Sequence, residues 1–148
     1  MRLSRASTYA VYGLSYLASQ APDRLVPLSE IREKWNLPEK HLAKLFNTLV
    51  RSGHLRSERG VHGGFALARP AASISALDIV RVIDGHRKHE ECPIHPAAPK
   101  DSNCCPVQKL VLEGRRQMEL LLGHASLVQL AQTSLRVNVP APRRRGST

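Results

Sequence analysis

Apolar residues recur at helical spacing in two successive segments, separated by a break at residues 36–38 with the sequence Asn-Leu-Pro. Proline disfavours helix at the residue before it and is preorganised for a first helical position, so a tight turn is expected at this break. We therefore predict a helix over residues 28–35, capped by Ser29, and a second helix from Pro38 to about residue 52. Two helices joined by such a turn form a helix-turn-helix.

The second of these helices has two chemically different faces at 3.6 residues per turn. Its apolar face is expected to dock on the core and consists of Leu42, Leu45, Phe46, Leu49 and Val50. The opposite, polar side carries our candidate DNA contacts, which are Lys40, His41, Lys44, Asn47, Thr48 and Arg51. Lysine, asparagine and arginine can meet phosphates, adenine edges and guanine edges respectively, and a helix that reads the major groove needs such exposed donors. The alternative is an ordinary solvated helix face.

Alternation of apolar and polar residues replaces the helical spacing after residue 53. Leu55 is expected to face inward and Arg56 outward before a glycine-rich tip; beyond the tip, Phe65 and Leu67 are expected inward and Ala66 outward. This pattern predicts a β-hairpin of two short strands.

The tip of this hairpin begins at Arg59 and contains three glycines within five residues. Glycine adopts positive φ readily, so the backbone there can lie close to another surface. Arg59 and His62 are further candidate DNA contacts, since the negative potential of a narrow minor groove attracts a guanidinium. A helix-turn-helix followed directly by such a hairpin is a winged helix.

Four more helices are expected around this module. They cover residues 7–20, a segment that begins with the capping pair Ser75 and Asp78 and ends at Gly85, residues 107 to about 122, and a short segment capped by Ser126 with Gln129. The fold class is therefore mainly α with a small β-hairpin wing: a winged helix-turn-helix plus a long dimerisation helix. We divide the chain into a DNA-binding domain (1–84), a cysteine-containing sensor loop (85–106), the dimerisation and C-terminal helices (107–139) and a disordered basic tail (140–148).

The helix over residues 107–122 has an apolar stripe longer than so small a domain can cover. Gly114 lies within this stripe, whose apolar members are Leu110, Val111, Met118, Leu121 and Leu122. A second copy of the same chain could cover this stripe without any other protein, so we expect a homodimer.

Composition and net charge further narrow the kinds of molecule that this protein could bind. The 148 residues suit a single domain with a modest core, and their formal net charge of +10 implies an acidic partner. Nucleic acid fits better than a membrane surface, because aromatic residues make up only 4% of the chain. No apolar run is long enough to span a bilayer, and residues 1–5 lead straight into a helix without a signal-peptide pattern. We expect a cytoplasmic protein that binds double-stranded DNA and no membrane.

All three cysteines lie in one irregular segment, between residues 85 and 106. Cys92 is followed by eleven residues and then by the adjacent Cys104 and Cys105, with His89, His95 and Asp101 nearby. Thiolates gathered on a loop of a cytosolic protein are more often metal-binding or redox-active than structural disulfides. A zinc or iron–sulfur site needs four ligands, so a fourth residue would have to join the three thiols. Free thiols without metal are the alternative.

Several stretches resemble the Rrf2 family of winged-helix regulators, which includes the iron–sulfur regulators IscR, NsrR and RirA. The resemblance covers essentially residues 1–135, and its most specific parts are the wing with the sequence RGVHGGFALARP and the following ISALDIVRVIDG. It implies a homodimeric repressor or activator that pairs through the long helix and binds imperfect palindromes. Many members also hold a [2Fe–2S] or [4Fe–4S] cluster in the loop before that helix.

Carried over by residue, the resemblance implies that Cys92 is the first and Cys105 the last cluster ligand. Ala98 occupies the usual place of the middle cysteine, so Cys104 is the available substitute. Thr8 and Gln108 stand where some members have a carboxylate and a histidine ligand. For the fourth ligand we expect His95, or alternatively His89, and the cluster type stays open.

The expected mechanism is a population shift between two dimer states. By the resemblance, the loop lies beside the dimer helix, so a change in the loop would alter the spacing of the two recognition helices and hence operator affinity. The alternative is a cluster-free regulator controlled by thiol–disulfide exchange or by a protein partner. An enzyme is not expected, because the sequence contains no phosphate-binding glycine loop, no paired carboxylates in an apolar setting and no nucleophile with an obvious base.

Overall fold

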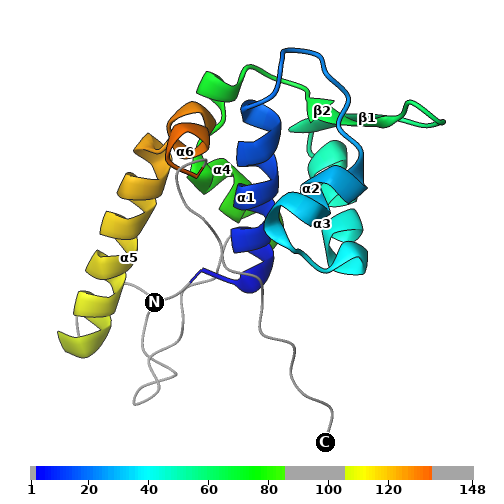
Figure 1. Ribbon diagram of the computed structural model, residues 1–148. Coiled ribbons are helices and arrows are strands. Elements are labelled where there is room, and N and C mark those ends of the chain that lie inside the picture. Colours follow the sequence, from blue (N-terminus) through cyan, green and yellow to red (C-terminus); the bar gives the residue numbers. More distant parts are fainter. Residues whose placement is uncertain (1–2, 86–105, 135–148) are drawn as a thin grey trace, which may run out of the picture.

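A computed structural model describes residues 3–85 and 106–134 of the chain. The elements are α1 (Arg5–Ala18), α2 (Leu28–Trp35), α3 (Glu39–Arg51), β1 (Leu55–Glu58), β2 (Gly64–Leu67), the 3-10 turn η1 (Ala71–Ser73), α4 (Ala76–Asp84), α5 (Pro106–His124) and α6 (Leu127–Ser134). Helix α1 runs through the middle, with α2 and α3 on one side and α4 and α6 on the other, while the hairpin and α5 project at opposite ends (Figure 1). The predicted fold class is confirmed, and the elements appear in the expected order.

Helix α1 begins two residues earlier than the predicted start at Ser7. Ser4 caps it, because the Ser4 hydroxyl accepts a hydrogen bond from the Ser7 backbone N–H at 2.9 Å. The same hydroxyl donates to the Asp84 carboxylate at the end of α4, which joins two elements distant in sequence. Ala10, Leu14 and Leu17 then form the buried side of α1 and contribute to the hydrophobic core.

The helix-turn-helix has the predicted helices, but its first cap is different. Pro27 and not Ser29 is the N-cap of α2, and no side chain caps the helix start. The sequence pattern suggested Ser29 because serine is a frequent cap, whereas here the chain is already helical from Leu28. Asn36 ends α2 in the left-handed conformation, with φ of 48°. Pro38 is the N-cap of α3, one residue before its first helical position.

The hairpin pairs β1 with β2 antiparallel, with Leu55 opposite Leu67 and Glu58 opposite Gly64. Our expectation that Ala66 faces solvent is wrong, because its exposed fraction is 4%. The segment between α1 and α2 lies beside this part of the hairpin: Val26 exchanges two backbone hydrogen bonds of 2.9 Å with Phe65, and Ala66 lines a cavity together with Pro22 and Asp23. A Cβ on Gly64 would lie 2.6 Å from the Val26 carbonyl oxygen, so glycine permits this close approach.

Helices α4, α5 and α6 form a connected unit beside α1. The predicted capping box of α4 is present, with Asp78 and Ser75 each bonding to the other's backbone N–H. Gly85 ends α4 with φ of 72°, as expected. The Ser126–Gln129 pair caps α6 in the same reciprocal manner. Backbone hydrogen bonds from Ala76 to Ala125 (2.8 Å) and from Leu127 to Ile74 (2.9 Å) fasten the start of α4 to the α5–α6 turn.

Helix α5 is two residues longer at its end than predicted, and its apolar stripe is largely uncovered. Leu110 and Leu121 are 73% and 72% exposed, and Val107 and Val111 are also exposed. Met118 and Leu122 are half-buried. Most of the predicted sensor loop and the whole predicted basic tail lie outside the described residues. Among the described helices, none combines the length and apolarity that a bilayer span requires.

Candidate DNA-binding surface

The outer side of α3 presents most of the predicted contact residues to solvent. Five of them are exposed, namely Lys40, His41, Lys44, Asn47 and Arg51. Thr48 is half-buried, and its hydroxyl donates to the Lys44 backbone carbonyl at 3.1 Å. Thr48 can therefore meet a ligand mainly through the lone pairs of its hydroxyl oxygen.

The opposite side of α3 fixes the helix in place. Leu42, Phe46 and Leu49 are fully buried, and Phe46 meets the Phe65 ring of the wing edge-on with centroids 5.1 Å apart. Aromatic pairs favour this perpendicular geometry. The recognition helix and the wing therefore share one apolar support, and the polar side of α3 keeps a defined orientation relative to the hairpin.

Several arginines elsewhere in the molecule form ion pairs, whereas the cations on this surface have no acidic partner among the described residues. Arg24 pairs with Glu30, Arg56 with Asp23 and Arg81 with Glu119, at 2.9, 2.7 and 3.4 Å. Within residues 3–85 and 106–134, by contrast, no ion pair involves the side chains of Lys40, Lys44, Arg51 and Arg59. Unneutralised positive charge therefore gathers on α3 and the wing, where it can attract phosphates.

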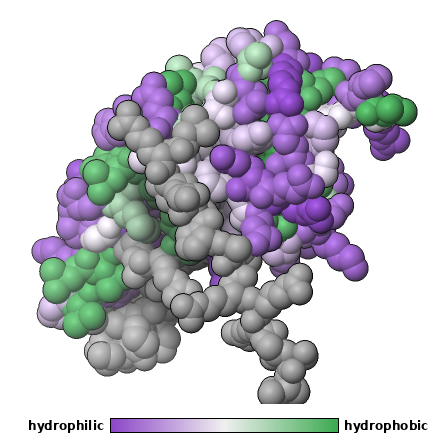
Figure 2. Space-filling view, in the orientation of Figure 1, coloured by the Kyte–Doolittle hydropathy of each residue, from purple (hydrophilic) through white to green (hydrophobic). Residues whose placement is uncertain are grey.

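The wing ends in a tight turn. The Gly63 N–H donates to the Gly60 carbonyl at 3.0 Å, and Gly60 has φ of 114°. Arg59 and His62 are exposed around this turn, and Val61 at its apex is 98% exposed. The space-filling view shows a small apolar patch at the end of the projecting wing, far from the apolar surface over α5 (Figure 2).

The sequence pattern did not indicate two contacts that support this surface, of which the first is buried and the second is partly exposed. His54 joins α3 to β1, and its Nδ1 lies 2.9 Å from the Ser52 hydroxyl. Burial, together with the charge of nearby Arg69, lowers the pKa of His54 below its usual range. Neutral His54 therefore packs between α3 and the wing at neutral pH. Histidine beside a glycine gave no sequence signal for such a role.

The second contact anchors α2 to α1. The Glu30 carboxylate accepts hydrogen bonds from the Tyr16 hydroxyl at 2.7 Å and from Arg24 at 2.9 Å. These bonds lower the pKa of Glu30, and the bond to Glu30 raises the pKa of Tyr16. The three residues come from α1, the following segment and α2, so no local pattern could have indicated them.

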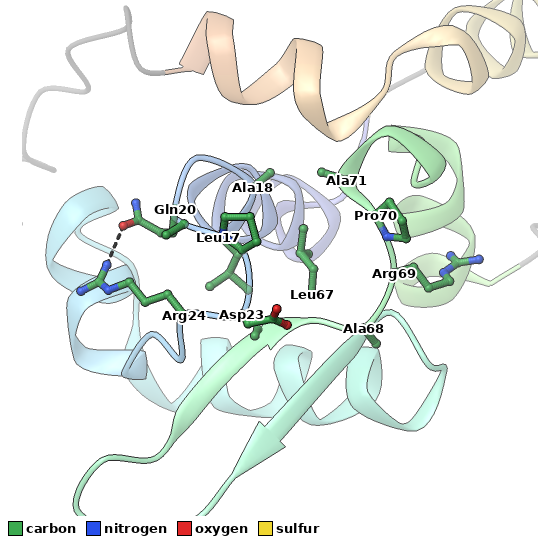
Figure 3. A pocket seen from close by; sticks show the side chains of 13 residues that line it. Leu17, Ala18, Gln20, Asp23, Arg24, Leu67, Ala68, Arg69, Pro70 and Ala71 are labelled. Atoms are coloured by element: carbon green, nitrogen blue, oxygen red, sulfur yellow. Dashed lines mark hydrogen bonds between the residues drawn. The ribbon is translucent and has the colours of Figure 1, made fainter.

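A shallow cavity of about 450 Å³ lies between the end of α1 and the segment after β2. Leu17, Leu67 and Pro70 contribute to its apolar lining, and in Figure 3 Arg24 turns toward Gln20 while Arg69 extends outward. The labelled arginines thus point away from the cavity, and we assign it no ligand.

The predicted cluster ligands Cys92, Cys104, Cys105 and His95 lie outside the described residues. Within residues 3–85 and 106–134, no three histidine, cysteine, aspartate or glutamate side chains are grouped in a way that could hold a metal ion.

The family model of Rrf2, described as an iron-dependent transcriptional regulator, matches residues 3–133, which is nearly the whole of the described fold. The protein belongs to the Rrf2 family. Rrf2 proteins are transcriptional regulators, so this chain is a DNA-binding regulator with a winged-helix fold and not an enzyme.

Solved structures of Rrf2 regulators superpose on most of the chain. An oxidized form of Staphylococcus aureus CymR has 29% sequence identity and a TM-score of 0.70, covering 89% of this chain and 97% of its own. CymR (YrzC), the global cysteine regulator of B. subtilis, has 26% identity and a TM-score of 0.73, covering 90% and 98%. IscR of T. potens has 25% identity and a TM-score of 0.69, covering 93% of each chain.

Proposed function

We propose that this Rrf2 protein is a homodimeric regulator that binds imperfect palindromes through α3 and the wing, with affinity tuned at the Cys92–Cys105 loop. The observation that carries the proposal is the positive charge of Lys40, Lys44, Arg51 and Arg59 on α3 and the wing, for which residues 3–85 and 106–134 provide no acidic partner. We assign base and phosphate contacts to α3, including His41, Asn47 and Thr48. Arg59 and His62 of the wing then reach the adjacent minor groove.

The apolar side of α5 supports the homodimer. Leu110, Leu121 and Val107 are each at least two-thirds exposed, whereas the opposite side of the helix contacts α4. Pairing two such stripes would bury the apolar surface that one chain leaves in water. Rrf2 regulators typically act as dimers, and two recognition helices related by a twofold axis match a palindromic site.

Two kinds of signal fit the sensor loop. An iron–sulfur cluster would be held by Cys92, Cys105 and Cys104, with His95 as the fourth ligand, and thiolates are the usual ligands of such clusters. The similarity to IscR and the iron-dependent description of the family support this reading. The alternative is a cluster-free regulator in which Cys92 and Cys104 or Cys105 exchange between thiols and a disulfide, or in which a protein partner acts. Similarity to CymR, a cysteine regulator also crystallised in an oxidized form, supports the thiol alternative.

Salt dependence tests the DNA-binding proposal. An operator selected from random duplexes should bind the dimer about 10³ to 10⁵ times more weakly at 200 mM than at 50 mM salt if six to ten phosphates are contacted. Lys44→Ala should reduce the slope by roughly 0.9 per lost contact, or about two in the dimer. Lys109→Ala on α5 is the matched control and should leave the slope unchanged. A nearly flat salt dependence of the wild-type protein would contradict the proposal.

A further inference from the structure

The apex of the wing carries an apolar residue that neither the core nor the proposed dimer uses. Val61 is 98% exposed, whereas the other strongly exposed apolar side chains in the described part of the chain, Val107, Leu110 and Leu121, lie on the α5 stripe. The wing and α5 project at opposite ends of the molecule, so a dimer paired through α5 leaves Val61 uncovered (Figures 1 and 2). A fully exposed valine does not stabilise the free protein, because an apolar side chain contributes to stability when it is buried.

The turn holds Val61 in one place. A Cβ on Gly63 would lie 2.3 Å from the Glu58 carbonyl oxygen, so the two sides of the turn are in close contact. At the base of the wing, Arg56 forms an ion pair of 2.7 Å with Asp23, and Phe65 is hydrogen-bonded to Val26. A preorganised arm loses little conformational entropy when it meets a partner.

The charges around Val61 indicate what that partner is. Arg59 and His62 flank it, and the nearby acidic side chain of Glu58 is paired with Arg56 at 3.3 Å. A polar rim with the positive charge of Arg59 around an apolar apex fits the minor groove, where arginine meets the negative potential and apolar side chains contact sugars or wedge between base steps. A membrane would need a broader apolar surface than one valine.

We propose that Val61 enters the minor groove of the operator and supplies a contact that does not depend on salt. This inference rests on the proposed DNA binding and adds to it a specificity residue. Because the guanine N2 amino group projects into the minor groove and adenine has no such group, Val61 favours A·T pairs where the wing docks. Arg59 supplies the electrostatic contribution to the binding free energy of the wing, and Val61 supplies the contribution from burial of apolar surface.

The test compares Val61→Ser with Arg59→Ala and with Val128→Ser, a matched change on α6. Val61 does not have positive φ, so serine fits the turn without strain. Burying less apolar surface at both wings should weaken operator binding by Val61→Ser on the order of tenfold at every salt concentration, with an unchanged salt slope. Arg59→Ala should lower the slope by about two in the dimer, and Val128→Ser should change neither quantity.

A second measurement places the contact in the minor groove. Replacing adenine by 2,6-diaminopurine adds an amino group to the minor groove and leaves the major-groove pattern intact. In the outer parts of the operator this change should weaken the wild-type protein and bring it close to Val61→Ser. The inference is overturned if Val61→Ser binds like wild type, or if its salt slope falls as in Arg59→Ala. In both cases salt-dependent binding by the wild type would leave the proposed function intact; without that binding, both proposals fail.

Discussion

Gly13 on α1 lies against the ring of Phe46 on α3. A Cβ built at Gly13 would be 2.8 Å from both Cε2 and Cζ of that ring. The ring has little room to move, because Phe46 is fully buried and also contacts the Phe65 ring. The absence of one methyl group at Gly13 therefore sets how closely the recognition helix packs on α1.

We expect Gly13→Ala to destabilise the protein. Overpacking a core costs about 1 to 3 kcal/mol, which exceeds the roughly 0.5 to 1 kcal/mol that alanine gains over glycine within a helix. Urea unfolding measures the difference. Gly123→Ala on α5 is the matched control, since its Cβ would meet Leu77 at an ordinary 3.6 Å. A gain in stability from Gly13→Ala as large as that from Gly123→Ala would show that the core adapts freely.

Residues whose role depends on local pattern could be predicted, and those whose role depends on distant partners could not. The exposure of Lys40 and Lys44 follows from helical periodicity alone. Gly13 and His54, by contrast, act through contacts with other elements, which periodicity does not encode. Ser29 was assigned as a cap from residue type, and the helix begins before it because Pro27 takes that place.

At the scale of elements, α5 is the helix whose exposed face most needs a partner. Leu121→Asp should leave a charge without a partner in the proposed subunit interface, and a charge buried in this way is strongly unfavourable. We therefore expect this variant to shift the protein from dimer to monomer. Light scattering coupled to size exclusion at micromolar concentration measures the change.

Leu120→Asp provides the control for that experiment. Leu120 is 47% exposed and is displaced by about 100° around the helix from its neighbour, away from the stripe. This variant should remain dimeric. A Leu121→Asp protein that is still fully dimeric would contradict the placement of the interface on α5.

Element order and type were predictable, whereas the non-local pairing of the wing was not. Apolar alternation indicated both strands, yet Val26 pairs with Phe65 across almost forty residues, and Ala66 is buried beside the segment that follows α1. Alternation describes one strand at a time, so it cannot show that another segment covers the outer face. The side of α5 that we expected to be uncovered, by contrast, is the exposed one, because its apolar stripe is larger than the surface that α4 covers.

At the scale of the whole molecule, the proposed switch predicts distinct effects of the three cysteines. Cys92→Ala and Cys105→Ala should each abolish the visible absorption and iron content of anaerobically purified protein, because water cannot replace a missing thiolate. Cys104→Ala should reduce both only if Cys104 substitutes for the ligand at Ala98. Circular dichroism should show a folded protein in each case, since these substitutions leave every residue of the core formed by the described part of the chain in place.

The thiol alternative predicts a different outcome. Wild-type protein prepared without oxygen would then contain no iron, and peroxide would produce a disulfide at Cys92 together with a change in operator affinity. That result would remove the cluster from the proposal while leaving the winged-helix regulator intact.

The firm connection of α4 to the α5–α6 turn has a consequence for the DNA. Because backbone hydrogen bonds and the Arg81–Glu119 pair fix α5 relative to the winged domain, a dimer joined through α5 would hold its two reading heads at a set distance and angle. One inserted base pair moves a half-site by about 3.4 Å and rotates it by roughly 35°. Base substitutions within a half-site would then weaken operator binding gradually, whereas a single base pair inserted between the half-sites would prevent one winged domain from binding. Operators of this regulator should therefore differ in base sequence far more than in the number of base pairs between their half-sites.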